Sequence, residues 1–496
     1  MIFPSLAEFE QLSLKGNVVP LVCRIPGDLE TPLSALLKID DTRNSFLLES
    51  VEGGERWARY SFLGSDPRSV IRIKGERFTI EEENRQKSYP SAGDPAAFLK
   101  GIMADFRAVP LPELPEFFGG TVGYLGYDVV RSFERLPDLK KPDLGFHDAV
   151  FFITRDVVIF DNLSHQMLLT TTVRIDEFFS VAEAYRHGVD RLENLRDRLS
   201  RPGPSRFRVR SSVAEPNIVS NMSQSKFESI VEQAKERIAG GDAIQVVLSQ
   251  RFKADSTATP LSIYRGLRMI NPSPYMFLFR SGDEVLAGSS PEVMVRSRNR
   301  EAVLRPIAGT RPRGRSPEDD KHLEEDLLTD EKEVAEHVML VDLARNDLGR
   351  IAEPGSVQVD GFKTVERYSH VMHLVSTVRA RMGEDFDSSD VLKATFPAGT
   401  LSGAPKIKAM EIIEELEPER RGPYGGCVGY ISFSGAMDMG ITIRTVMIKG
   451  SDTYVQAGAG IVADSVPERE YQETLNKAEA MRKALIWAEA LEEIPS

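Results

Sequence analysis

Short strand-like segments alternate irregularly with long helical patterns along this chain, and this order limits the folds that it can adopt. Residues 45–52, 68–75 and 149–162 have the short apolar runs of strands, whereas 181–199 has the apolar period of a helix. No regular strand–helix–strand rhythm appears, so we expect an α+β fold. In the second half, strands are expected at 244–252, 275–280, 284–288, 429–435 and 453–462, and helices near 317–349, 405–417 and 468–491.

The chain has a candidate boundary at residues 201–223, which are rich in Pro, Ser and Arg and have no sustained apolar period. With 496 residues, the chain is too long for one ordinary core. We therefore expect two large domains or one two-lobed body, with an N-terminal region at 1–200, a linker at 201–223 and a second region at 224–488. Ser225 and Glu228 have the spacing of a capping box, which predicts that a helix opens the second region and ends at Gly240-Gly241.

Composition excludes several classes of protein. A net charge of −13 argues against a nucleic-acid surface, which needs a basic field. The only cysteines, Cys23 and Cys427, have no metal-type spacing, so neither a disulfide framework nor a zinc site is expected. No apolar run approaches bilayer length, and the first residues lack the order of a signal peptide. We expect a soluble protein of the reducing cytoplasm that binds neither nucleic acid nor membrane.

Two glutamate pairs at helical spacing form a candidate metal site. Glu333 and Glu336 lie three residues apart on one predicted helix, beside His337, and Glu470 and Glu473 have the same spacing on another. If the two helices meet, four carboxylates without cysteine favour a hard cation, and Mg²⁺ fits best. Such residues are also common on solvated helix faces, and spacing alone leaves both interpretations open.

Three glycine-rich segments could bring backbone amides close to an anionic ligand. They are Gly309-Thr310, residues 397–406, and Gly458-Ala459-Gly460, and Lys406 and Arg444 could supply positive charge. None is a P-loop, and each alone is compatible with an ordinary turn. His373 lies in an apolar stretch, where a hydrogen-bonded core histidine is the usual alternative to a functional one.

The pattern GGxVGY occurs twice, at residues 119–124 and 425–430. Two glycine-rich strands that arose independently and an internal duplication both explain it.

Four long segments together resemble the chorismate-utilising enzymes, in that family's order and spacing. They are residues 305–315, 330–350, 396–426 and 456–474, and the resemblance extends over roughly 225–485. The first region resembles the companion N-terminal region of anthranilate and aminodeoxychorismate synthases. The resemblance implies a large two-lobed fold with mixed or antiparallel sheets packed face to face and helices outside.

Two residues indicate which of this family's activities to expect for the chain. Family members that add water carry a lysine where this chain has Gln245, so the resemblance implies ammonia as the nucleophile. Aminodeoxychorismate synthases typically carry a lysine where this chain has Ala308, which favours the anthranilate-forming members. These convert chorismate and ammonia to anthranilate and pyruvate through aminodeoxyisochorismate, a lyase reaction that commits chorismate to tryptophan synthesis. Aminodeoxychorismate synthesis and a non-catalytic tryptophan sensor are the alternatives.

The resemblance also implies a partner. Neither cysteine lies in the GxCxG setting of a glutaminase nucleophile. Ammonia is therefore expected from a separate glutamine amidotransferase subunit, which implies a hetero-oligomer.

Transferred position by position, the resemblance assigns roles to residues of the second region. Mg²⁺ would lie between Glu336 and Glu473, with Glu333 and Glu470 in support. Glu292 matches the family's general acid, which requires a raised pKa. His373 and Thr400 would lie beside the ring during loss of pyruvate. The residues expected around chorismate are Gly309, Thr310, Tyr424, Arg444, Gly458, Ala459, Gly460 and Lys406, with Gln245 near the nucleophile.

Two further segments resemble the family's feedback site for L-tryptophan. The residues expected to form it are Leu48, Glu49 and Ser50 in one segment and Pro274, Tyr275 and Met276 in the other. Read alone, the first is a strand end and the second a proline turn.

Overall fold

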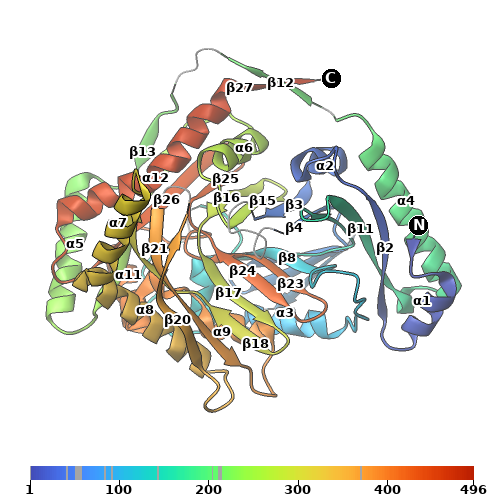
Figure 1. The fold of residues 1–496 in the computed structure, drawn as a ribbon, viewed down its shortest axis with the longest axis horizontal. Helices are drawn as coiled ribbons and strands as arrows, with labels where there is room; N and C mark the ends of the chain where they lie inside the picture. Colours follow the sequence, from blue (N-terminus) through green and yellow to red (C-terminus); the bar gives the residue numbers. More distant parts are fainter. Residues whose placement is uncertain are drawn as a thin grey trace.

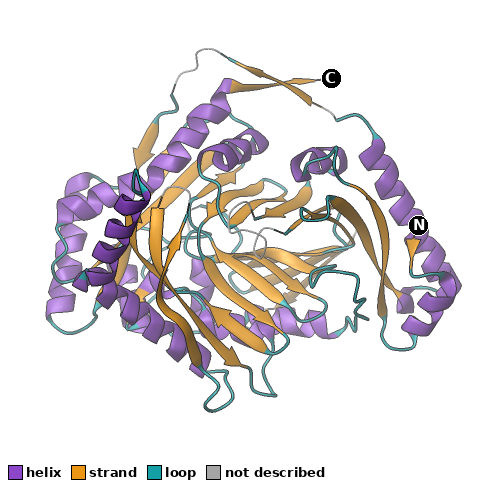
Figure 2. Cartoon of the chain, viewed as in Figure 1, coloured by secondary structure: helices purple, strands orange, loops and turns teal. Residues whose placement is uncertain are grey.

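Two large antiparallel β-sheets lie at the centre of the molecule with helices around them (Figures 1 and 2). The computed structural model describes residues 2–40, 43–50, 59–82, 85–90, 93–141, 144–203, 205–210, 215–368 and 371–495. The named strands pair antiparallel, and the α+β prediction is confirmed. No helix in these ranges has the length and hydropathy needed to cross a bilayer.

The first sheet, sheet A, contains strands from both ends of the chain. In spatial order they are β1 (Ile2–Phe3), β2 (Val18–Pro26), β11 (Gln166–Arg174), β10 (Asp156–Asp161), β4 (Tyr60–Ser65), β3 (Asn44–Glu49), β15 (Tyr275–Ser281), β16 (Glu284–Ser290), β25 (Thr445–Lys449), β26 (Asp452–Ile461), β14 (Gln245–Ala254) and β13 (Ile218–Ser220), with β22 (Gly403–Ala404) also paired to β14.

The second sheet, sheet B, is built in the same way. Its order is β19 (Ile307–Pro312), β21 (Val371–Arg381), β18 (Glu301–Leu304), β17 (Val293–Arg298), β24 (Met437–Ile441), β23 (Cys427–Ser432), β8 (Gly120–Leu125), β9 (Ala149–Ile153), β5 (Ser69–Lys74), β6 (Arg77–Glu82) and β7 (Arg85–Pro90), with β20 (Gln358–Arg367) also paired to β21. Both sheets therefore continue across the expected boundary at 201–223, and the division into regions stays a prediction.

The two sheets pack face to face around the main core. Phe152 of β9 stacks on Phe279 of β15 at 4.5 Å between ring centroids, and Phe62 of β4 meets Tyr430 of β23 edge-on at 5.7 Å. Phe277 and Phe279 face this core, whereas Met276 and Leu278 belong to a second core on the other face of sheet A. The apolar run at 275–279 thus reflects a strand buried on both sides.

Helices cover the outer faces and extend along the edges of the sheets (Figure 2). They are α1 (Leu6–Ser13), α2 (Pro32–Ile39), α3 (Pro95–Ala104), α4 (Val181–Ser200), α5 (Gln224–Ala239), α6 (Pro260–Ile270), α7 (Pro317–Thr329), α8 (Glu331–Gly349), α9 (Ser388–Thr395), α10 (Gly399–Ser402), α11 (Lys406–Leu416) and α12 (Pro467–Ala490), with 3₁₀ turns at Tyr127–Ser132 and Ile175–Glu177.

The helix at the start of the second region differs from the prediction at its first turn. The N-cap of α5 is Ser223, whose hydroxyl accepts a hydrogen bond from the backbone of Lys226, so the predicted box of Ser225 and Glu228 is wrong. Ser225 lies inside the first turn and contacts the Ser223 hydroxyl at 3.0 Å. The predicted end at Gly240 is confirmed.

Part of the predicted linker also has regular structure. It includes β13 and β12 (Ser205–Val209), which pairs with β27 (Leu491–Pro495), whereas residues 204 and 211–214 of the linker lie outside the described ranges. The predicted helical stretch at 317–349 is two helices that meet at Asp330. The carboxylate of Asp330 caps α8 by accepting from the amides of Lys332 and Glu333.

The two GGxVGY segments are neighbours in sheet B. Strands β8 and β23 pair with Gly123 directly opposite Gly429. A Cβ atom on Gly123 would lie 2.0 Å from the carbonyl oxygen of Val150 on the next strand, so the close approach of backbones requires glycine here.

We predict that Gly123→Ala lowers the free energy of unfolding by about 1–3 kcal/mol, because the backbone of β9 must move to admit the methyl group. The midpoint of urea unfolding would measure this. Gly101→Ala is the matched control, since a Cβ there meets nothing within 4 Å in helix α3, and it should be neutral or stabilising by up to about 1 kcal/mol. Equal midpoints for Gly123→Ala and the unaltered chain would contradict the packing described here.

Candidate active site

One cavity of about 790 Å³ gathers most of the predicted site residues from distant parts of the chain. Helices α8 and α12, strands β14, β19, β21 and β26 and the α10 turn all contribute to it. The predicted residues that line it are Gln245, Glu292, Gly309, Thr310, Glu333, Glu336, His373, Thr400, Tyr424, Arg444, Gly458, Gly460, Glu470 and Glu473.

The pairing of β14 with β26 forms one wall of this cavity. Ser249 lies opposite Gly458 and Val247 opposite Gly460, so alternate residues of both strands face the same side. A Cβ atom on Gly458 would lie 2.9 Å from the Tyr424 hydroxyl oxygen, and one on Gly460 would lie 2.6 Å from Gln245 Nε2. Glycine at these two positions therefore leaves room for the side chains of Tyr424 and Gln245.

Two predicted substrate residues do not line the cavity. Ala459 lies between the two glycines, and its side chain is buried on the other side of the strand among apolar residues of α5 and α11. The ammonium of Lys406 binds the carboxylate of Asp347 at 2.7 Å and the carbonyl oxygen of Thr395 at 3.1 Å. Lys406 thus ties α11 to α8, and the structure places it in the packing behind the cavity.

Glu292 is a buried carboxyl group immediately before β17. Burial raises its pKa to about 7, against the opposing effects of a hydrogen bond from Thr400 and of the positive charge of Lys477. The Thr400 hydroxyl donates to Glu292 Oε1 at 2.9 Å. At pH 7, about half of the Glu292 carboxyl groups therefore hold a proton that can be given to a ligand in the cavity.

His373 lies on β21 opposite Thr310 of β19. Its Nδ1 is 3.0 Å from the carbonyl oxygen of Gly309, which can only accept, so Nδ1 carries the hydrogen and Nε2 is free to accept a proton. Burial lowers the pKa of His373; the hydrogen bond that the imidazole donates to the Gly309 carbonyl oxygen opposes this effect, and the charge of Arg444 adds to it. The imidazole is therefore neutral at pH 7.

Both predicted glutamate pairs line the cavity. Burial raises the pKa of Glu333, and the neighbouring charge of Glu336 raises it further. Burial also raises the pKa of Glu470, where Ser465 opposes and Glu473 adds to the effect. Gln245 Nε2 donates to Glu336 Oε1 at 3.2 Å.

These carboxylates are not yet arranged as ligands around one point. Within the described residues, no three His, Cys, Asp or Glu side chains form a ready metal cluster. Glu473 instead binds the ammonium of Lys477 at 2.6 Å. The donor chemistry suits a hard divalent cation, which would relieve the repulsion within each pair.

Sequence reasoning missed two basic residues of this cavity, Lys332 and Lys477. Lys477 follows Glu473 by one helical turn, and this spacing could have revealed it. Its ammonium also donates to the carbonyl oxygen of Gly458 at 3.0 Å. Arg444, by contrast, makes no side-chain hydrogen bond to another described residue, and burial lowers its pKa, so an anion is the partner that this guanidinium lacks.

A second cavity, of about 900 Å³, contains the six residues predicted to bind tryptophan. The two segments meet because β3 and β15 pair with Glu49 opposite Met276. Tyr275 donates its hydroxyl hydrogen to Asp438 at 2.7 Å, and Arg296 donates to both. The carboxylate of Glu49 accepts from the Tyr264 hydroxyl at 2.5 Å, so this side chain is directed toward α6.

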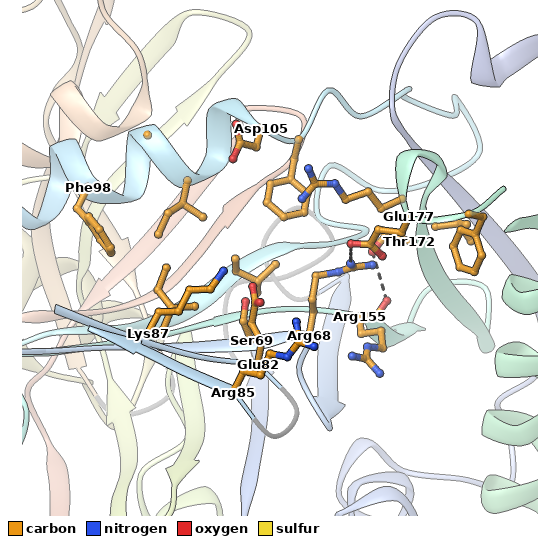
Figure 3. Close-up of a pocket in the computed structure, with 18 of the residues that line it drawn as sticks. Arg68, Ser69, Glu82, Arg85, Lys87, Phe98, Asp105, Arg155, Thr172 and Glu177 are labelled. Carbon is orange, nitrogen blue, oxygen red and sulfur yellow. Dashed lines mark hydrogen bonds and ion pairs between the residues drawn. The ribbon is translucent and has the colours of Figure 1, made fainter. Parts of the chain in front are cut away.

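A third cavity, of about 1260 Å³, contains none of the predicted residues (Figure 3). It lies between α3, α4 and the β5–β7 end of sheet B and is rich in arginine. Several of these cations have acidic partners within the protein: Arg68 binds Glu177, and Arg191 binds Asp156 at 2.5 Å. Its charges are thus partly neutralised by the chain itself.

Sequence comparisons identify relatives of the whole chain. The profile of a family described as chorismate binding enzyme matches residues 46–483. Anthranilate synthase component 1 of Acetivibrio thermocellus is 46% identical over 490 residues, which cover 98% of this chain and 99% of the relative. The protein of the same name from Aquifex aeolicus is 48% identical over 491 residues, 99% of each chain.

Similar solved structures include a protein of the same name as these relatives. Anthranilate synthase component I from Streptococcus pneumoniae superposes with a TM-score of 0.77 at 38% identity, covering 92% of this chain and 98% of that one. The menaquinone-specific isochorismate synthase of Escherichia coli superposes with a TM-score of 0.66 at 21% identity, covering 97% and 98%. The second similarity shows the shared fold.

We predict that Glu292→Gln stabilises the protein at pH 8. The folded-state pKa of Glu292, about 7, lies above its usual value of 4.5, so the folded chain retains a proton between these values that the unfolded chain has lost. Stability contributed by this group therefore falls as pH rises from 4.5 to 7, by up to about 3 kcal/mol.

The variant escapes this loss because glutamine does not ionise. Urea unfolding at pH 5 and pH 8 should show the two proteins converging at the lower pH and the variant more stable at the higher. A stability difference that does not change between these pH values would refute the raised pKa.

Proposed function

This chain belongs to the chorismate-binding enzyme family, among the anthranilate synthase component 1 proteins, and from that premise we propose that it is an oxo-acid lyase that converts chorismate and ammonia to anthranilate and pyruvate. The observation that carries the proposal is the set of groups in the 790 Å³ cavity. The cavity contains Glu292, which can donate a proton, and the neutral imidazole of His373. It also contains the guanidinium of Arg444, which can bind an anion, and the carboxamide of Gln245. Aminodeoxychorismate synthesis has no such specific observation in its favour.

Chorismate is a dianion, and the cavity offers fixed donors to one of its carboxylates. Arg444 has no competing side-chain partner among the described residues, and Lys477 and the Tyr424 hydroxyl lie against the same β26 segment. Backbone amides beside Gly309 and Gly458 can approach because no Cβ intervenes. We assign the enolpyruvyl carboxylate to this side of the cavity.

The two glutamate pairs also line the cavity, and a ring carboxylate beside them would need a cation. We propose that Glu336 and Glu473 hold Mg²⁺, with Glu333 and Glu470 in support, because four carboxylates and a substrate anion cannot share this space without positive charge. When bound, Mg²⁺ would supply the charge that orients the ring carboxylate.

In the first step, the nitrogen of ammonia bonds to ring carbon 2 while the 4-hydroxyl group departs. Hydroxide is a poor leaving group, so Glu292 donates its proton and water leaves. The Gln245 side chain is neutral, which leaves ammonia rather than an activated water as nucleophile. Its carboxamide is positioned by the hydrogen bond to Glu336.

In the second step, the amino intermediate loses pyruvate and the ring becomes aromatic. The proton on ring carbon 2 must leave as the bond between ring carbon 3 and the ether oxygen breaks. The neutral Nε2 of His373 is in the protonation state that can accept it. The hydrogen bond from Nδ1 to Gly309 holds this tautomer.

Component 1 proteins imply a second component, and we propose that a glutamine amidotransferase subunit delivers the ammonia in a hetero-oligomer. We place the assembly in the cytoplasm, since Cys23 and Cys427 are both free and buried.

The 900 Å³ cavity is the proposed feedback site for L-tryptophan. Its residues come from the first region and from the NPSPYM segment, and Pro274 lines both this cavity and the active site. A ligand that moves this segment would therefore act on both.

We predict that the purified chain with chorismate, Mg²⁺ and ammonium above pH 8 forms anthranilate and pyruvate in equal amounts. Anthranilate fluorescence and coupled pyruvate detection would follow both products. A chelator should abolish the reaction, and tryptophan should reduce it. Chorismate loss without pyruvate would indicate aminodeoxychorismate or isochorismate synthesis, and tryptophan binding without any turnover would indicate a sensor.

A further inference from the structure

Arg421 is the largest side chain that is almost completely buried, and it does not line the active-site cavity. Only 1% of its surface is exposed. A guanidinium loses favourable hydration in such a place, and buried ion pairs are often replaceable by apolar residues at no loss of stability. The burial of Arg421 therefore indicates a function other than stabilising the fold.

The guanidinium of Arg421 joins three separate parts of the cavity wall. Nη1 donates to the carbonyl oxygen of Leu401 at 2.6 Å, and Nη2 donates to that of Val247 at 2.7 Å. Its carbon atom lies 5.7 Å from the ring centroid of Tyr424. Leu401, Val247 and Tyr424 all line the cavity.

A second set of bonds fixes the guanidinium itself. Glu417 binds Arg421 Nε at 2.9 Å and Nη2 at 2.6 Å, as a fork-to-fork pair. The same carboxylate accepts from the amide and the hydroxyl of Ser249 at 2.7 and 2.8 Å. The centroid of the Tyr127 ring lies 4.5 Å from the guanidinium carbon atom. The planar group is thus held in one orientation.

We propose that Arg421 is a positioning residue that sets Thr400 and Tyr424 relative to strand β14, and this inference rests on the proposed function. Thr400 directly precedes Leu401 and bonds Glu292, so the bond from Arg421 to Leu401 fixes the donor that the acid depends on. Arg421 acts through these groups and does not touch substrate.

The pH dependence of turnover distinguishes positioning from bulk stability. The Thr400 bond lowers the pKa of Glu292, so a displaced Thr400 raises it. The charged group that acts on Glu292 is Lys477 of α12, and Lys332, Arg444 and the four glutamates share the cavity. A higher pKa keeps the acid protonated to higher pH.

The test compares Arg421→Lys with the unaltered chain in ammonium-dependent anthranilate formation between about pH 6.5 and pH 9. Lysine retains the charge but cannot make the planar fork. We expect kcat to fall by about tenfold or more at the lowest pH. The ratio of variant to wild-type kcat should rise with pH, and the ionisation of ammonia cancels in this ratio.

Arg251→Lys is the matched control. Arg251 is also deeply buried and binds the same segment through the carboxylate of Glu419 and the carbonyl oxygen of Arg420, and Arg251 itself does not line the cavity. The ratio of Arg251→Lys kcat to wild-type kcat should stay within about twofold of one at every pH, because Arg251 makes no contact that changes in the transition state.

If Arg421→Lys does not fold, the double variant Arg421→Met with Glu417→Gln replaces it, because it removes both charges and keeps an acceptor for Ser249. Unchanged kcat in the folded variant, or a loss that is the same at all pH values, would overturn the proposal. Failure of the unaltered chain to make anthranilate would instead refute the proposed function.

Discussion

The antiparallel pairing of β14 with β26 is the constraint on which the active-site cavity depends. It puts Gln245, Val247 and Ser249 on the same side as Gly460 and Gly458. Three side chains from other elements contact this ladder: Tyr424 lies over Gly458, Lys477 bonds the Gly458 carbonyl oxygen, and Arg421 bonds the Val247 carbonyl oxygen. Because the side-chain period of a strand is two, a shift of one residue would turn both glycines away and direct Ala459 into the space.

Unbalanced charge is the second property of the site. The cavity holds four glutamates in two pairs and three cations, of which Lys477 is bound to Glu473. Burial, together with the neighbouring charge of Glu336 or Glu473, raises the pKa values of Glu333 and Glu470. Burial also raises the pKa of Glu292 to about 7 and lowers that of His373, so near neutral pH the cavity contains a carboxyl group that can donate a proton and an imidazole that can accept one. The proposed binding of a dianion by a chain with a net charge of −13 depends on Arg444, whose guanidinium has no side-chain hydrogen bond to any residue that the structure describes.

The sequence predicted local features of the site well. The strands, the glutamate pairs, the Gly-Ala-Gly segment and the resemblance of Glu292 and His373 to family residues all come from short stretches, and the cavity contains nearly all of them. Lys406 was predicted to bind substrate, but its ammonium binds Asp347 instead. The sequence did not reveal this contact because Asp347 lies 59 residues away in the chain. Ala459 could have been separated from its neighbours by strand alternation alone. No local pattern marks Arg421, whose importance derives from its depth.

The sequence could not predict which distant strands pair, because this also depends on contacts between residues far apart in the chain. The echo of GGxVGY was visible, but the register that sets Gly123 opposite Gly429 depends on the whole of sheet B. Likewise, the boundary at 201–223 showed a change of composition, while both sheets draw strands from either side of it.

The central claim is that a protonated Glu292 in this cavity drives departure of the hydroxyl group. Single-turnover mixing of Glu292→Gln with chorismate, Mg²⁺ and ammonium tests it most directly, with chorismate affinity measured in parallel. We expect nearly unchanged affinity and a fall of about 10²–10⁴-fold in the rate of chorismate consumption, because the general acid is lost. Consumption at the wild-type rate would contradict it.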